Sequence, residues 1–183
     1  MNKLALALAV TGAFALSVPT APATASLETY EAKAAASDAA AMARADLAAT
    51  FGKSRVKPGQ FLWRNVPGAA GNERVVVGLS DQQAYLYRGS ELVAAAAIST
   101  GTSKNPTPTG IFQVLEKKTM HFSRKYDNAP MPFMQRIDRF GIALHAGHNP
   151  GRPASHGCIR LPKQFAAKLF STTGVGTPVM IGA

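Results

Sequence analysis

The sequence is poor in cysteine, in acidic residues and in long apolar runs. Cys158 is the only cysteine among the 183 residues, which excludes an internal disulfide. Only 10 acidic residues accompany 20 lysines and arginines, so the formal net charge is +10. Such a charge favours anionic partners. No block of Lys and Arg alternates with aromatic residues as in many nucleic-acid-binding segments, so we expect no nucleic acid partner.

The one long apolar run, Leu4–Val18, lies near the start of the sequence. Lys3 precedes it and Ala23-Thr24-Ala25 follow it, which is the pattern of a secretory signal peptide cleaved after Ala25. The run is short for a membrane span, and no later segment comes closer to one. We therefore expect residues 1–25 to be removed and the rest to be secreted or periplasmic, with no integral membrane segment. An acidic polymer such as a bacterial cell wall fits both the export and the charge.

Residues 26–58 are predicted to form an alanine-rich helix and a linker ahead of the main domain, residues 59–183. The helix is expected over residues 27–51, because alanine favours helices and Gly52 can end one. Glu28 and Glu31 suit its first turn. Large apolar residues are sparse in this segment, so we expect the helix to pack weakly on the main domain or to fray.

The main domain is predicted to be mainly β, a sandwich with a short helix near its end. Runs rich in β-branched or alternating apolar residues indicate strands at 74–80, 82–89, 91–100, 110–117, 140–146 and 177–182, with residues 61–63 as a short additional strand. The helix is expected at Pro162–Ser171, with proline at its first position and Phe165 and Leu169 on its apolar face. Residues 117–139 combine Met, Pro, aromatic and charged residues, and we expect a long loop that serves as a lid or binding segment.

The segment "GRPASHGCIRLP" at residues 151–162 contains the lone cysteine two residues after His156. A cysteine attacks carbonyl carbon as the thiolate, so it needs a neighbouring base near neutral pH. His145, at the end of a predicted strand, and His156 are the candidate bases. Gly157 allows close approach of a substrate, and the amides of Gly157 and Cys158 are candidates for stabilising an oxyanion.

Two other interpretations of Cys158 stay open on the residues alone. An isolated cysteine is commonly a small buried hydrophobe. A zinc site is the second, because imidazoles and a thiolate can complete a tetrahedron, although no Cys-x-x-Cys or His-Glu-x-x-His pattern is present. The four candidate ligands are His145, His148, His156 and Cys158. For His121 we expect an ordinary structural or surface role.

The segment "HAGHNPGRPASHGCIRLP" resembles the signature of the L,D-transpeptidases with the YkuD-type catalytic domain. In both, a histidine and a spacer precede Ser/Thr-His-Gly-Cys and a short tail. The resemblance also covers "SDQQAYLYRGSELVAAAAISTG", the turn "TPTG" at Thr107–Gly110 and "YDNAPMPFMQRIDRFGIALHAG", and it extends over about residues 73–182. It implies a YkuD-type β-sandwich.

The resemblance implies a role for each matching position. Cys158 would be the nucleophile, and His145 the general base and acid, oriented by a backbone carbonyl near Ala146. Support for the oxyanion and the thiolate turn would come from Ser155, His156 and Gly157. Substrate contacts would come from Arg160, Tyr126 and Met131, and for Arg160 the alternative is that it ties down the loop.

The implied reaction is acyl transfer on peptidoglycan stem peptides. Cys158 would attack the carbonyl between the third residue and D-Ala, D-Ala would leave, and an amine would resolve the thioester. The acceptor would be another stem or a wall-attached protein, and carbapenem-type inhibitors would acylate the same thiol. Neither a metal nor an organic cofactor is implied. The alternatives are a thiol carboxypeptidase or wall-protein-releasing hydrolase on the same scaffold, and a non-catalytic module that binds the cell wall.

Overall fold

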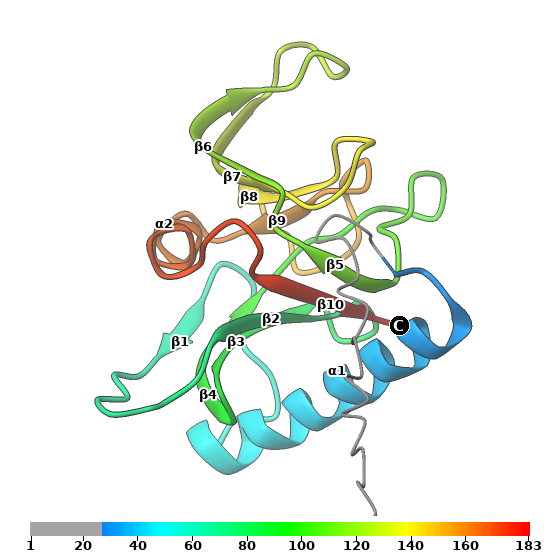
Figure 1. Ribbon diagram of the computed structural model, residues 1–183. Helices are drawn as coiled ribbons and strands as arrows, with labels where there is room; N and C mark the ends of the chain where they lie inside the picture. Colours follow the sequence, from blue (N-terminus) through cyan, green and yellow to red (C-terminus); the bar gives the residue numbers. More distant parts are fainter. Residues whose placement is uncertain (1–26) are drawn as a thin grey trace, which may run out of the picture.

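Two β-sheets form the centre of the computed structural model, which describes residues 27–183 (Figure 1). The predicted signal peptide lies outside the described residues. The larger sheet has the order β1-β4-β3-β2-β10-β5, and the smaller has the order β6-β7-β8-β9. The strands of the larger sheet are β1 Phe61–Trp63, β2 Glu73–Gly78, β3 Gln83–Arg88, β4 Glu91–Ala97, β5 Gly110–Gln113 and β10 Pro178–Gly182. Those of the smaller are β6 Glu116–Phe122, β7 Pro130–Arg136, β8 Ala143–Ala146 and β9 Ile159–Leu161.

The mainly β prediction is confirmed, and each strand predicted from alternation or β-branching is present, with shifted ends. Most neighbouring strands are antiparallel, whereas β10 pairs with β2, and β9 with β8, in parallel. Alternation along β2 directs Val75 and Val77 to the core between the sheets and Val76 to the opposite face. The larger sheet is therefore covered on both faces.

The main core lies between the larger sheet, the short strands β8 and β9, and helix α2, Lys163–Thr172. Phe165 and Leu169 of α2 are fully buried there, as their helical spacing predicts. Pro162 lies just before the helix rather than at its first position. Because α2 follows β9 directly, this core also holds the strand that continues from Cys158.

The expectation of a weakly packed alanine-rich helix is wrong. Helix α1, Tyr30–Phe51, lies along the outer face of the larger sheet (Figure 1), with Thr29 as its N-cap and Gly52 as its C-cap. Ala36 and Ala43 are fully buried, and Ala40 and Leu47 pack against Val76 and other residues of the sheet. Small side chains bring the helix backbone close to the strands, so the contact does not need large apolar residues.

The predicted loop at residues 117–139 is instead mostly a β-hairpin. Strands β6 and β7 pair from Glu116↔Arg136 to Phe122↔Pro130, and the hairpin projects from the body of the molecule (Figure 1). The residues of β6 are exposed or half-buried and mostly polar, so the apolar alternation that marks a strand is missing from the sequence. Lys117 anchors the hairpin by donating hydrogen bonds to the carbonyls of Phe170 and Thr173 at the end of α2.

Among the described residues, no helix is both long enough and apolar enough to cross a bilayer.

The close approach of α1 to the sheet predicts a strong effect of adding one methyl group to Gly182. A Cβ there would lie 2.5 Å from the carbonyl oxygen of Ala36 and 2.7 Å from the Cα of Ser37. We expect Gly182→Ala to lower the free energy of unfolding by about 1–3 kcal/mol, measured by urea denaturation. Gly174→Ala is the matched control, because a Cβ at Gly174 meets nothing within 4 Å. Equal stabilities of the two variants would contradict this packing.

Candidate active site

The parallel pairing of β8 with β9 brings the candidate nucleophile and base to neighbouring strands. Leu144 pairs with Ile159 and His145 with Arg160. Side chains alternate between the faces of a strand, and Cys158 directly precedes β9, so Cys158, Arg160 and His145 share one face. His145 is buried, with 7 % of its surface exposed, and Cys158 is half-buried.

The ring of His145 is held by a backbone hydrogen bond. Its Nδ1 lies 2.8 Å from the carbonyl oxygen of Ala146, the residue named in the sequence analysis. A carbonyl only accepts, so Nδ1 carries the proton and the Nε2 lone pair remains free to take one. Burial lowers the pKa of His145; the Ala146 carbonyl opposes this, and the charges of Arg160 and His121 add to the lowering. The imidazole is therefore neutral at neutral pH.

The thiol of Cys158 lies in mainly apolar surroundings. It packs against a cluster of Met131, Met134 and Ala143, and its Sγ lies 3.7 Å from the carbonyl oxygen of Gly141. Burial raises the pKa of the thiol above its ordinary range, while a backbone hydrogen bond with Ala143 and the charge of Arg160 lower it. The resting pair is thus a neutral thiol and a neutral imidazole.

The turn before the cysteine is held by Ser155. Its buried hydroxyl donates to the Cys158 carbonyl at 2.6 Å and accepts from the Gly157 N–H at 3.1 Å. Gly157 has φ +111°, and a Cβ there would also lie 2.6 Å from Cδ1 of Ile142, so only glycine fits.

The expectation that both amides of this turn are free is wrong for Gly157, because its N–H is bonded to Ser155. Within residues 27–183, no hydrogen bond uses the Cys158 N–H. Among the described residues of this turn, the N–H groups of His156 and Cys158 are therefore the backbone donors without a partner, and the Cys158 N–H is the one beside the sulfur.

Thr107 supports the cysteine turn in a way that its sequence context does not indicate. Its buried Oγ1 accepts from the Gly101 N–H at 2.8 Å and donates to the Gly157 carbonyl at 2.7 Å. The turn "TPTG" was visible in the sequence, but these partners lie 6 and 50 residues away, and no local signal indicates a bond of that range.

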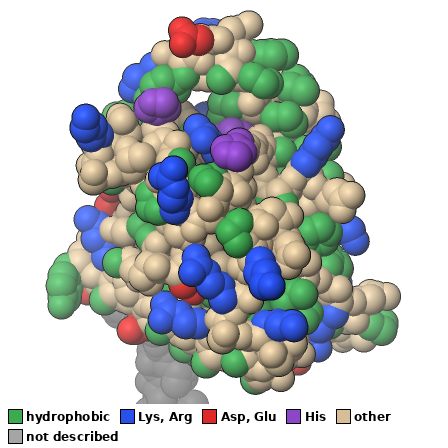
Figure 2. Space-filling model, turned by 180° about the vertical axis from the view of Figure 1, so that it is seen from behind, with side chains coloured by type: hydrophobic (Ala, Val, Ile, Leu, Met, Phe, Trp, Pro, Cys, Tyr) green, Lys and Arg blue, Asp and Glu red, His purple; other side chains and the backbone are tan. Residues whose placement is uncertain are grey.

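The β6–β7 hairpin extends over the cysteine turn. At its tip, the ring of Tyr126 stacks on the exposed ring of His156, with centroids 4.3 Å apart and an angle of 17°. Met131 of β7 belongs to the cluster beside Cys158. His121 pairs with Met131 across the hairpin, and its charge contributes to the lowered pKa of His145. Figure 2 shows an opening beneath the top of the molecule with histidine side chains at its margin.

Arg160 lies beside both candidate catalytic groups. A Cβ added at Gly147 would lie 3.2 Å from Cγ of Arg160 and 3.4 Å from Cε1 of His145, so the side chains of Arg160 and His145 border the same glycine. The backbone of Arg160 exchanges hydrogen bonds with Ser99. None of the hydrogen bonds or ion pairs found in residues 27–183 involves its guanidinium group, so the contact of this side chain with the loop is one of packing beside Gly147.

The four candidate zinc ligands do not converge. Within the described part of the chain, no group of three His, Cys, Asp or Glu side chains is arranged to hold a metal ion. His148 and His156 are exposed, whereas His145 is buried. The zinc interpretation therefore has no geometric support among residues 27–183.

Comparison with known proteins identifies the family. A family model of the L,D-transpeptidase catalytic domain (YkuD) matches residues 72–181. The chain belongs to the L,D-transpeptidase catalytic domain family. The family resemblance and the YkuD-type fold expected from the sequence are thus confirmed, while a search of curated proteins finds no match.

Solved structures of L,D-transpeptidases have the same fold. An L,D-transpeptidase from Mycobacterium smegmatis is 21 % identical, with a TM-score of 0.57 over 69 % of each chain. LdtMt1 in complex with imipenem is 22 % identical, with a TM-score of 0.56 over 60 % of this chain and 58 % of that one. L,D-transpeptidase 3 from Mycobacterium tuberculosis, with a faropenem-derived adduct, is 19 % identical, with a TM-score of 0.56 over 61 % and 60 %. The chain thus spans less than two thirds of the length of the latter two.

The bonds of Thr107 predict that its hydroxyl is needed for a stable cysteine turn. Thr107→Val leaves the Gly101 N–H and the Gly157 carbonyl without this partner, and Thr107 is buried. We expect a loss of about 1–3 kcal/mol in the free energy of unfolding, measured by urea denaturation. Thr109→Val is the control, because the Thr109 hydroxyl has no hydrogen bond within residues 27–183. A variant at Thr107 as stable as the control would show that the turn does not depend on this hydroxyl.

Proposed function

We propose that this chain is a cysteine-dependent L,D-transpeptidase that acts on peptidoglycan stem peptides outside the cytoplasm. The observation that carries the proposal is the position of His145, which shares a strand face with Cys158 and has its Nδ1 proton bound to Ala146. Its Nε2 is thereby the available base for the thiol. Family membership supports the reaction class.

The reaction begins with transfer of the Cys158 proton to Nε2 of His145. The sulfur attacks the carbonyl between the third stem residue and D-Ala, and the Cys158 N–H stabilises the oxyanion. His145 returns the proton to the nitrogen of D-Ala as the C–N bond breaks, which leaves a thioester. An amine from a second stem or a wall-attached protein then attacks the thioester, gives up its proton through His145, and restores the thiol.

Substrate contacts are assigned to residues around this pair. The guanidinium of Arg160 is suited to a substrate carboxylate, since it has no side-chain partner in residues 27–183. Tyr126 of the hairpin stacks on His156, and Met131 lies in the apolar cluster beside Cys158, so an apolar part of the stem would pack against these two residues. Lys and Arg side chains are spread over the face that carries the histidines, with few acidic side chains (Figure 2), which suits an anionic stem.

Acylation by imipenem tests the nucleophile and the base. Opening of the β-lactam ring should add the inhibitor mass to the wild-type chain, detected by intact-mass spectrometry, and Cys158→Ala should remain unmodified. His145→Gln should slow acylation by about 10²–10⁴-fold, because it removes the general base. His148→Gln is the control, since His148 is exposed, and it should react as the wild type. An adduct on Cys158→Ala would overturn the assignment.

Product analysis with and without an acceptor amine then separates transfer from hydrolysis.

The pH dependence of acylation follows from the environment of His145. Neutral imidazole is the active form, and burial lowers its pKa below the ordinary 6.5. The rate should therefore stay constant as the pH falls to 6.5 and decrease only below it, as the ring becomes protonated. In Arg160→Gln a repulsive charge is lost, so the pKa of His145 rises and the decrease begins at higher pH. A wild-type rate that already falls between pH 8 and 7 would contradict this protonation state.

A further inference from the structure

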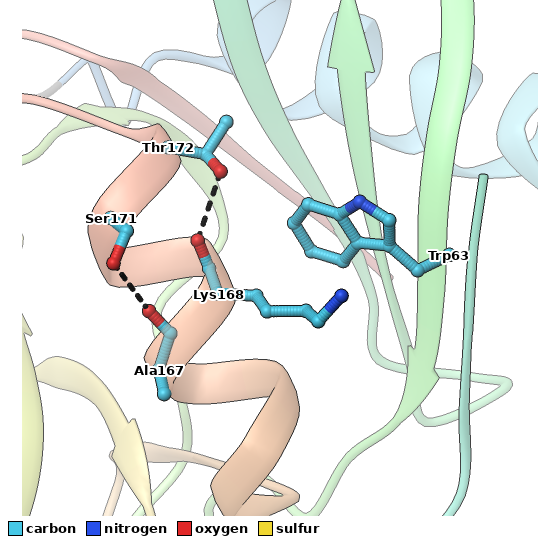
Figure 3. A pocket seen from close by; sticks show the side chains of 5 residues that line it. All are labelled: Trp63, Ala167, Lys168, Ser171 and Thr172. Atoms are coloured by element: carbon cyan, nitrogen blue, oxygen red, sulfur yellow. Dashed lines mark hydrogen bonds between the residues drawn. The ribbon is translucent and has the colours of Figure 1, made fainter. Parts of the chain in front are cut away.

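A shallow hollow of about 300 Å³ lies away from Cys158, between β1 and the outer side of α2. It is lined by Trp63 of β1 and by Ala167, Lys168, Ser171 and Thr172 of α2 (Figure 3). Trp63 is the only tryptophan in the sequence. Neither the proposed reaction nor the main core uses the open side of this hollow.

The indole of Trp63 is packed on one side and lightly covered on the other. Its ring meets Phe165 edge-on at 6.0 Å and 67°, which fixes it against the core. The Lys168 ammonium lies 5.1 Å from its centroid. Lys168 is exposed, and such a contact is worth only about 0.5–1 kcal/mol, so a ligand that offers the ammonium a better partner can uncover the ring.

The helix side of the hollow offers hydrogen-bond acceptors. The hydroxyl of Ser171 donates to the Ala167 carbonyl at 3.1 Å, and that of Thr172 donates to the Lys168 carbonyl at 2.9 Å (Figure 3). With their protons used in this way, both oxygens keep lone pairs for a donor. Lys168 forms none of the ion pairs found in residues 27–183. An aromatic face, a free cation and two acceptors therefore meet in one hollow.

We infer that this hollow binds the glycan strand of peptidoglycan, a step that rests on the proposed function. The polarised C–H groups of a sugar ring are attracted to the negative face of an indole. N–H and O–H groups of an acylated amino sugar match the acceptors at Ser171 and Thr172. The carboxylates of the stems that such a strand carries match the Lys168 ammonium, and they also match the excess of positive charge on the chain.

The hollow and the nucleophile are close enough for one polymer to contact both. Four residues, 159–162, separate Cys158 from α2, and Lys168 is the sixth residue of that helix, so the Cα atoms of Cys158 and Lys168 are at most about 25 Å apart. A strand with its stem peptides spans such a distance, whereas a single amino acid does not. The hollow would thus hold the polymer while a stem enters the site at Cys158.

Tryptophan fluorescence tests this inference without catalysis, because Trp63 is the sole source of the signal. Two probes are titrated into the full chain. The first is N-acetylglucosaminyl–N-acetylmuramic acid bearing L-Ala–D-Glu, which has carboxylates but lacks the bond that Cys158 would attack. The second is the neutral dimer of N-acetylglucosamine. Both should change the fluorescence, and the carboxylated probe should bind about three- to tenfold more tightly, as for one charge-assisted contact.

The matched variants are Lys168→Met and Lys163→Met, since both residues are exposed on α2 but only Lys168 lines the hollow. Lys168→Met should remove the preference for the carboxylated probe, and Lys163→Met should retain it. No fluorescence change with either probe at millimolar concentration, or equal losses in the two variants, would overturn the inference. Imipenem acylation is run on the same samples. Normal acylation without glycan binding refutes only the glycan site, and absent acylation refutes the proposed reaction.

Discussion

The short parallel ladder between β8 and β9 is the contact on which the site depends. It places His145 beside Arg160 and directs Cys158 to the same face. On its other edge, β9 is bonded to the segment that continues from β4, because Ser99 and Arg160 exchange backbone hydrogen bonds of 3.0 and 2.9 Å. A strand of three residues is too short to be stable alone, so its position is set by the two sheets that it joins.

The same junction explains why the site is buried and neutral. Strands β8 and β9 pack into the core between the sheets, and burial shifts the pKa of Cys158 upward and that of His145 downward. A buried thiolate–imidazolium pair would have to be compensated for lost hydration, whereas a neutral pair avoids this cost. The positive charge of Arg160 lowers both pKa values, so it favours the thiolate and the neutral imidazole together. Arg160 thus favours the thiolate but disfavours the imidazolium that a proton transfer from Cys158 to His145 would form.

The sequence predicts the parts of the fold that depend on local patterning. Alternation and β-branching are sufficient for β2 and β3, and the apolar spacing of Phe165 and Leu169 is sufficient for α2. Strand β6 could not be predicted from such patterns because it is exposed and polar. Its hydrogen-bonded pairing with β7, rather than burial of its side chains, makes it a strand. The close packing of α1 could not be predicted either, because the sequence does not distinguish a buried alanine from an exposed one.

The candidate site shows the same division. Cys158 and His145 could be proposed because thiol and imidazole chemistry is visible in residue type, and the motif around them resembles a family. The bonds from Thr107 to the turn, and the stack of Tyr126 on His156, join residues that are distant in sequence, and only tertiary structure brings them together. Gly157 is a further example. Its residue type indicated a tight turn, but only the structure shows that its amide donates to Ser155 and is not free.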